Sequence, residues 1–495
     1  MESVPKERAD SVKELEYTGK AIPKGRRFCT LCGGVKRETA FEADSTHCKD
    51  CCEKMLHTHV HGYAFLSVAL VVAALAAAVY LGVNTFPIVK QAHTADSLAA
   101  DCALYDAVEA YEKVFDAVDE RNEAAGSTWY CAGLRTWEAY YDVYAGVYSA
   151  NSAADDAAER LDKSVMQNSA QLSALLEIKQ VNDAIRAQVT AIGQEYQAET
   201  ADDLPYEEVL GKLSAIEVDG DERLVKGYLE LFKADLAQYC NPDKPEIADA
   251  FYEKALAYLP EETMMISVNR AQCALNAEQY ESVLAPARQI IEGNRNDTDA
   301  YGWLVEAYYS LGKKADAMAV LEELQTAVPD TPLYYMLRVK YAVRDGDFDL
   351  AETLCNRQDE ANSETADAAF NTLLARDTLP KKAERIFLES INYSLWEAAL
   401  MLLQGDEESA FNIAYNYAFN YAYYYEYITG KTTLNQRIVN MTTLCAELCK
   451  GKDDEVQEAK TVLSQVGLCD EQTQQIIDGK ISLQEAFVEG KVDWL

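Results

Sequence analysis

Four cysteines near the start of the chain are the residues best suited to chemistry. Cys29 and Cys32 form one C-x-x-C pair, and Cys48 and Cys51 form a second pair after a gap of fifteen residues. Two such pairs can direct four thiolates at one point, which is the tetrahedral arrangement that zinc prefers, and Gly33 lets backbone amides approach the sulfur. We therefore predict that these four cysteines hold one structural zinc ion.

The residues around these cysteines resemble the small zinc knuckles of the zinc-ribbon and treble-clef type. The resemblance implies a zinc-binding module over residues 26–56, behind a flexible segment over residues 1–25. Some proteins with this pattern are nucleases of the HNH class, but here no catalytic segment follows Cys51, so only zinc binding carries over. A segment this small cannot bury a sufficient core, and zinc would supply folding free energy on the order of 10 kcal/mol or more.

An apolar stretch separates this module from the rest of the chain. Residues 63–89 contain no Asp, Glu, Lys or Arg, and residues 64–83 supply the roughly 20 apolar residues that a membrane-spanning helix needs. We predict a transmembrane helix over residues 62–88. Small residues recur every four positions within it, at Ala74, Ala78 and Gly82, so self-association of the chain through this face is a hypothesis.

The charges that flank this stretch predict its orientation. Eleven Lys and Arg residues precede it, whereas Lys90 is the single basic residue among the twenty that follow. The positive-inside rule therefore places the N-terminus in the cytoplasm and the part of the chain beyond about residue 88 outside it. The cytoplasm is reducing, which favours zinc thiolates over disulfides in the cysteine module. We expect a protein of a bacterial plasma membrane.

Composition excludes several classes of function. The 45 Lys and Arg residues against 82 Asp and Glu residues argue against nucleic-acid binding. Six basic residues between Lys20 and Arg37 could contact lipid or nucleic acid, but a role in setting topology is favoured. All five histidines lie at or before His93, so the last 402 residues can hold no histidine-dependent catalytic site. We predict that the chain is not an enzyme.

The chain beyond residue 92 has the pattern of amphipathic helices, with a repeat period near 34 residues and no period-two strand pattern. The segment 298–331 resembles a tetratricopeptide repeat, in which two antiparallel helices pack through small and apolar residues. In this segment Gly312 would make the turn between the helices and Pro329 would end the second helix. The residues that carry the resemblance are Tyr301, Leu304, Tyr308, Gly312, Ala317, Leu321, Leu324 and Pro329.

Neighbouring segments continue this pattern in both directions. The following unit has Gly346 at the place of the turn, whereas the two preceding units, within 229–297, lack glycine there. We predict repeats over 229–361, with helical flanks over 92–228 and 362–495 that are degenerate repeats or end caps. The predicted fold class is mainly α, a tetratricopeptide-like α-solenoid with one transmembrane helix and a small zinc module.

The resemblance implies a binding groove lined by the first helix of each repeat. Such grooves bind peptides, chain termini or other domains. An equally weighted alternative is that the residues at these places only form the solvated side of the helices. The groove positions in this chain are Gln272, Asn276, Glu306, Tyr309, Lys340 and Arg344.

One further segment, 411–428, contains seven tyrosines. An exposed face of tyrosine and asparagine could stack on sugars or on a peptide, because tyrosine offers a flat apolar ring with a polar tip. Packing of these rings between neighbouring helices is the favoured interpretation.

Together these patterns predict a membrane-anchored scaffold that binds a protein or an envelope component outside the cytoplasm. A second hypothesis makes the same architecture a receptor that relays external binding through the zinc module. A third, less favoured, is an envelope hydrolase with two catalytic carboxylates, which would need a deep pocket with two carboxylates about 5 to 9 Å apart.

Overall fold

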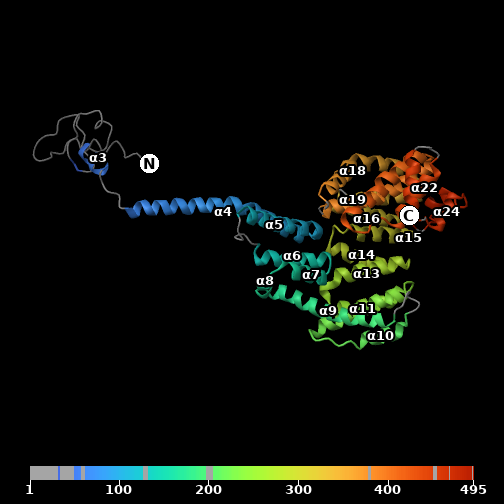
Figure 1. Ribbon diagram of the computed structural model, residues 1–495, viewed down its shortest axis with the longest axis horizontal. Helices are drawn as coiled ribbons and strands as arrows, with labels where there is room; N and C mark the ends of the chain where they lie inside the picture. Colours follow the sequence, from blue (N-terminus) through green and yellow to red (C-terminus); the bar gives the residue numbers. More distant parts are fainter. Residues whose placement is uncertain are drawn as a thin grey trace, which may run out of the picture. The chain divides into compact units, whose positions relative to one another are not determined.

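The computed structural model describes residues 32–33, 49–56, 62–125, 132–196, 204–329, 331–376, 379, 381–449, 454–467, 469–492 and 494–495. The chain divides into two compact units, 1–86 and 87–495. The described residues form helices, turns and loops without a strand (Figure 1).

The first unit contains α3 (Lys49–Leu56) and most of α4 (Gly62–Ala100), a helix of 39 residues. Apolar side chains of α4 are exposed, among them Val79 at 64% and Val83 at 69%. Among the described residues, two helical stretches are long and apolar enough to cross a membrane, Ala69–Ala100 with none of its apolar window buried and Ala383–Gln404 with 61% buried. The predicted span over 62–88 therefore lies within one continuous helix.

The second unit begins with the end of α4 and continues through paired helices. Its first part contains α5 (Leu104–Ala125), α6 (Leu134–Val147), α7 (Ala150–Arg160), α8 (Lys163–Gln167), α9 (Ala170–Tyr196), α10 (Tyr206–Ser214), α11 (Glu222–Cys240), α12 (Pro245–Tyr258) and the 3-10 turn η3 (Pro260–Glu262). Its middle part contains α13 (Thr263–Asn276), α14 (Tyr280–Gly293), α15 (Thr298–Ser310), α16 (Lys314–Ala327), α17 (Pro332–Arg344) and α18 (Phe348–Arg376). Its last part contains α19 (Lys381–Gln404), α20 (Glu407–Asn412), the π-helix η4 (Ile413–Phe419), α21 (Asn420–Thr429), α22 (Gln436–Leu448), α23 (Asp454–Val466), α24 (Glu471–Ile477) and the π-helix η5 (Gln484–Val488).

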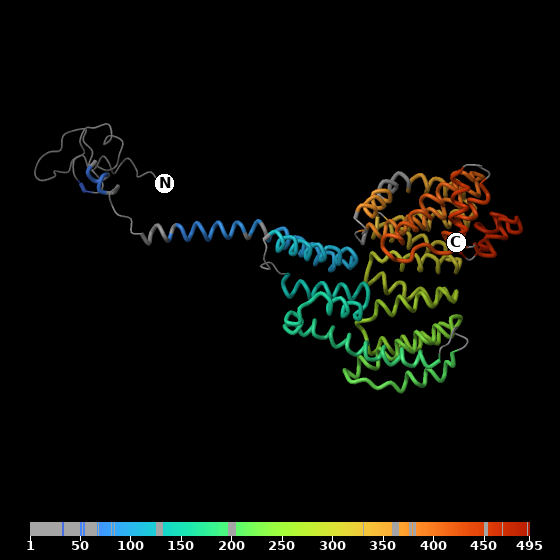
Figure 2. Tube along the Cα trace, in the orientation of Figure 1, coloured from blue at the N-terminus to red at the C-terminus, as the bar shows by residue number. Residues whose placement is uncertain are grey.

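The middle helices pack as antiparallel pairs that follow one another in chain order. Contacts join α11 to α12, α13 to α14, α15 to α16 and α17 to α18. Figure 2 shows this order as successive bands from green to orange. The apolar positions of the 298–331 pattern form the core between these pairs, where Tyr301, Leu304, Ala317 and Leu321 are at most 1% exposed.

The turns within the pairs use the left-handed backbone region at equivalent places. Gly312 has φ +72° between α15 and α16, and Gly346 has φ +74° between α17 and α18. Glu278, thirty-four residues before Gly312, has φ 55° between α13 and α14. A side chain makes this conformation costly, so the α13–α14 turn is made without the residue that suits it best.

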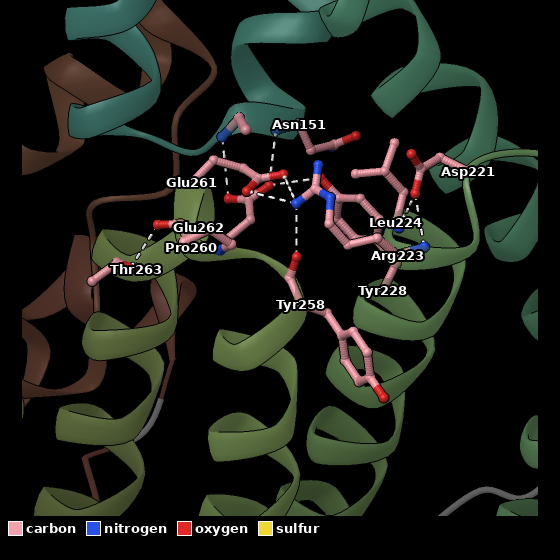
Figure 3. Close-up of polar contacts among 11 residues, drawn as sticks. Asn151, Asp221, Arg223, Leu224, Tyr228, Tyr258, Pro260, Glu261, Glu262 and Thr263 are labelled. Carbon is pink, nitrogen blue, oxygen red and sulfur yellow. Dashed lines mark hydrogen bonds and ion pairs between the residues drawn. The ribbon is translucent and has the colours of Figure 1, made fainter.

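The turn between α12 and α13 joins the repeats to the preceding helices (Figure 3). The buried carboxylate of Glu262 accepts hydrogen bonds from the backbone N–H groups of Ala150 and Asn151, each at 3.1 Å, and from the Tyr228 hydroxyl at 2.7 Å. These two N–H groups belong to the first turn of α7, which has no intrahelical acceptors for them. Next to Glu262, Arg223 pairs with Glu261 at 2.7 Å. Residues about 110 positions apart are thus held together.

The loop between α14 and α15 contacts both flanks of the array. The backbone N–H of Arg295 donates to the Cys102 carbonyl at 2.9 Å, and the Leu104 N–H donates to the Asn294 side chain at 3.2 Å. On the other side, the Thr298 hydroxyl donates to Glu389 of α19 at 2.8 Å. The helices before and after the repeats therefore meet at one loop, 294–298.

Candidate functional site

The predicted zinc ligands are described only in part. Cys29 and Cys48 lie outside the described residues, whereas Cys32 is exposed and Cys51 is buried in the first turn of α3. Within the described ranges, no group of three or more His, Cys, Asp or Glu side chains could hold a metal ion. Because Cys29 and Cys48 lie outside these ranges, zinc binding stays a prediction.

The six predicted groove residues fall into two sets. Gln272 and Asn276 are exposed on α13. Glu306 and Tyr309 on α15, with Lys340 and Arg344 on α17, are only partly exposed and come together.

An ion pair and two aromatic rings join α15 to α17. The Lys340 ammonium lies 2.5 Å from a carboxylate oxygen of Glu306, and the Tyr341 hydroxyl donates to the same oxygen at 2.9 Å. The rings of Tyr309 and Tyr341 stack with centroids 3.8 Å apart. The Tyr309 hydroxyl also donates to Asp345. The predicted groove residues Glu306 and Lys340 of two successive repeats thus form an ion pair with each other.

Positive charge exceeds negative charge at this junction. Three cations, Lys340, Arg344 and Arg437 of α22, act on the one carboxylate of Glu306. The buried Nε atoms of Arg344 and Arg437 have no hydrogen-bond partner among the described residues. Lys340 and Arg344 also lie over the ring of Trp396 of α19, at 5.9 and 5.7 Å from its centre. The repeats therefore carry a local cationic centre within an acidic chain.

The pKa values at this centre follow from burial and from neighbouring charges. Burial lowers the pKa of Lys340, Arg344 and Arg437, and the two arginines add to this effect on Lys340. Burial alone would raise the pKa of Glu306, but Lys340, the Tyr341 hydroxyl and Arg344 together hold it below its ordinary value. Glu306 is therefore ionised and the centre keeps a net positive charge at neutral pH.

The C-terminal segment of the chain lies against this centre. Gly490 has φ +70°, and a Cβ atom built there would lie 1.6 Å from Nη1 of Arg344. Trp494 and Leu495 are buried in the core that includes α19 and α22. The C-terminal segment thus lies against the predicted groove position Arg344, while Gln272 and Asn276 on α13 are exposed.

A cavity of about 450 Å³ lies beside the 294–298 loop, between α5 and α19. Carboxylates dominate its lining, and several of them have partners: Glu389 accepts from the Thr298 and Thr331 hydroxyls at 2.8 and 2.5 Å. Burial, with the nearby charge of Asp299, raises the pKa of Asp297 to about 6. The full lining is Tyr105, Asp106, Glu109, Tyr148, Asp297, Thr298, Asp299, Glu384, Arg385, Leu388, Glu389, Asn392 and Lys431.

Sequence reasoning missed both Arg437 and this cavity. Arg437 lies outside the 34-residue pattern, on a helix that folds back toward α17. The cavity joins residues from 105 to 431, and no local spacing relates them. Only the basic type of Arg437 in an acidic chain could have drawn attention to it.

Comparisons with known proteins were made by sequence and by structure. The family model described as "Tetratricopeptide repeat" matches residues 274–341. The crystal structure of the P58(IPK) TPR domain covers 77% of this chain and 98% of its own, at 12% identity and a TM-score of 0.21. The crystal structure of yeast Tom70 covers 81% of this chain and 91% of its own, at 13% identity and a TM-score of 0.21. A search of curated proteins gave no match.

The family match covers the end of α13 through most of α17. It confirms, in this coarse form, the prediction of a tetratricopeptide-like helical array. It also includes four of the six groove positions, from Asn276 to Lys340.

Proposed function

We propose that this protein is a single-pass membrane scaffold whose tetratricopeptide-like array binds a protein or peptide outside the cytoplasm, with a structural zinc module on the cytoplasmic side. A tetratricopeptide-like array suits protein binding, and such folds are typically scaffolds rather than enzymes. The observation that carries the proposal is the exposure of Gln272 and Asn276 at predicted groove positions of α13, in or next to the residues 274–341 that match the tetratricopeptide family model.

The partner-binding part is tested by cross-linking in intact cells, followed by identification of captured proteins. The test variant is Gln272→Arg with Asn276→Arg, because both side chains are exposed and the change should leave the fold intact. The matched control is Met318→Arg on α16, a residue that is 38% exposed on the second helix of a repeat. Loss of one captured protein in the groove variant alone supports the proposal, and equal capture by all three proteins contradicts it.

Membrane anchoring is supported by the apolar surface of α4. Twenty residues of α-helix span about 30 Å, which is the thickness of the hydrocarbon core of a bilayer. Leu70, Val79, Val83 and Val89 are each more than half exposed in the fold, and exposed apolar surface of this extent needs a cover. Protease added to intact cells should digest the part beyond residue 88 and spare the first 60 residues. The reverse pattern would invert the proposed topology.

The zinc module is tested by metal analysis of the full-length chain. We expect one zinc per chain, lost when Cys29→Ser and Cys48→Ser are combined, because two thiolates cannot complete a tetrahedral site. A metal-free wild-type chain purified without chelators would contradict this part of the proposal.

The receptor hypothesis differs from the scaffold in what the cytoplasmic module does. Deleting residues 1–55 should leave the external binding and the phenotype of a pure scaffold unchanged. In a receptor the same deletion should abolish the phenotype and keep external binding.

A carboxylate-dependent hydrolase is the second candidate function, and the cavity beside loop 294–298 favours it. Asp297, with a pKa near 6, would keep its proton in mildly acidic solution and could act as a general acid. Asp297→Asn should then abolish a hydrolytic activity that the wild-type chain shows on envelope polymers. We favour the scaffold because Asp297 also caps α15 by accepting from the Ala300 N–H at 3.0 Å, which gives this carboxylate a structural role.

A further inference from the structure

The tyrosine-rich segment places part of its aromatic surface outside the core. Tyr417 is 48% exposed and Tyr424 is 43% exposed, whereas Tyr421 between them is 8% exposed. The segment begins in the last two residues of α20, passes through the π-helix η4 and continues as α21. π-helical turns are rare and are found frequently at functional sites. Tyr421 thus packs between helices as expected, whereas Tyr417 and Tyr424 keep nearly half of their surface exposed.

The rings of this row are held in fixed positions by packing beneath them. Tyr421 stacks on Phe370 at 4.4 Å and on Phe387 at 5.2 Å, and its hydroxyl donates to Asp367 at 2.5 Å. Tyr417 meets Tyr421 edge to face at 5.7 Å. A surface whose rings are already oriented loses little conformational entropy when a ligand stacks on it.

A hollow of about 210 Å³ lies beside Tyr417 and Tyr421. The Ser390 and Ser394 hydroxyls donate to backbone carbonyls at 2.8 and 3.0 Å, so their oxygens keep lone pairs for a ligand. Among the described residues that line it there is no Lys or Arg, which excludes phosphate, sulfate and nucleic acid as ligands. Its polar lining residues are Gln358, Asp367, Ser390, Tyr393, Ser394 and Glu397.

We propose that this hollow and the row of Tyr417, Tyr421 and Tyr424 bind a neutral, extended oligosaccharide. A sugar ring has an apolar C–H face that stacks on an aromatic ring, and hydroxyl groups that donate to carboxylate and hydroxyl oxygens. Tyr417 would carry one ring, with its hydroxyls directed to Asp367 and the serine oxygens. Tyr424, three residues after Tyr421 on the same side of the helix, would carry a further ring of the same chain.

The chemistry of the hollow favours a sugar over a peptide. A proline-rich peptide would stack on the same rings, but proline has no N–H group to donate to Asp367 and to the serine oxygens. Because Tyr417 lies on η4 and Tyr424 on α21, the two exposed rings follow each other along the chain and suit an extended ligand, as β-1,4-linked sugars form. This inference goes beyond the proposed binding of a protein and does not depend on it.

The test is calorimetric titration of the full-length chain, in a detergent without a sugar headgroup, with cellohexaose and with chitohexaose. We expect at least one to bind, and Tyr417→Ala to weaken that binding about tenfold. Asp367→Asn, which keeps the size of the side chain, should weaken it less. The control is Tyr239→Ala: Tyr239 is 54% exposed on α11, outside the tyrosine-rich segment, and does not line the hollow.

Several outcomes would overturn this proposal. Failure of both oligosaccharides to bind the wild-type chain would do so, as would equal weakening by Tyr239→Ala and Tyr417→Ala. Affinity for a neutral sugar should also be unchanged between low and high salt. If a basic or proline-rich peptide binds through Tyr417 and neither sugar does, the row is a peptide site instead.

Discussion

The helices α4 and α19 both contain an apolar stretch of membrane-spanning length, yet they differ in what covers that stretch. In α19 the largest apolar side chains are buried under neighbouring helices, with Trp396 at 1% and Leu400 at 0% exposed. In α4 Val79 and Val83 are more than 60% exposed. Hydrophobic composition alone therefore does not distinguish a core helix from a spanning one. The helices α17, α18 and η4 pack against α19, and no described helix covers the exposed part of α4 in the same way.

The largest expected effect comes from placing a charge in each helix. Leu400→Asp should destabilise the array by at least about 4 kcal/mol, because it buries a carboxylate without a partner. Val72→Asp in α4 should leave the array stable to within about 0.5 kcal/mol, since the side chain is exposed in the fold and lies in the other compact unit. Chemical unfolding of both variants measures this, and similar losses would mean that α4 is a core helix.

The next effect concerns the same α4 substitution in a membrane. Val72→Asp with Val79→Asp should shift the chain from the membrane to the soluble fraction, since each central Asp costs about 2.5 to 3.5 kcal/mol of insertion free energy. Fractionation of cells, compared with the Val72→Thr and Val79→Thr control, measures this shift. A wild-type chain that is soluble without detergent would remove the distinction between the two helices.

A smaller effect depends on the ionisable groups that α19 faces. Burial raises the pKa of Asp297 from about 3.8 to about 6, while Arg385 of α19 opposes the shift and Asp299 adds to it. The unfolded chain releases this proton at lower pH than the folded chain, so this group makes the array lose stability as pH rises from about 4 to about 6. Asp297→Asn should remove about 1 to 3 kcal/mol of this pH dependence and still cap α15.

The control for this substitution is Asp349→Asn, on the exposed first turn of α18. It should leave the slope of stability against pH as it is in the wild type. An unchanged slope in Asp297→Asn would show that the carboxylate is not buried in solution. α19 would then resemble α4 more closely than the structure indicates.

The smallest effect concerns the turns within the helix pairs, which let one helix pack against the next. No such turn follows the exposed part of α4 directly. Gly312→Ala should destabilise the array by about 1 kcal/mol, because alanine is strained at φ +72°. Glu278→Gly should change stability in the opposite direction, by about 0.5 kcal/mol, because the strain relieved at φ 55° exceeds the added entropy of the unfolded chain. Changes of equal sign, measured by chemical unfolding, would contradict the equivalence of the two turns.

The sequence predicted what depends on local spacing. The 34-residue period anticipated the α15–α16 pair and the turn at Gly312, because helix packing and turn conformation repeat with the chain. The same period showed that the α13–α14 unit has no glycine at its turn, and there Glu278 takes the left-handed conformation. The groove prediction placed Glu306 and Lys340 at equivalent positions one 34-residue period apart. It could not show that the two side chains form an ion pair with each other.

What the sequence could not predict depends on contacts between distant segments. Arg437 approaches Glu306 only because α22 folds back toward the repeats. Gly490 contacts Arg344 because the C-terminal segment after η5 also returns to the repeats. Neither contact has a periodic signal. The π-helical register that exposes Tyr417 is equally invisible, since no residue type marks a π-helix.

The loop 294–298, held by hydrogen bonds to both flanks, has a mechanical consequence. In an open solenoid each repeat contacts its neighbours alone, so a pulled chain can lengthen one repeat at a time. Here residues near 103 and residues near 389 are hydrogen-bonded to the same loop. An early repeat therefore cannot unfold alone before these hydrogen bonds break. Under tension the array should behave as a closed loop rather than a spring, holding its length until it gives way in a single large step.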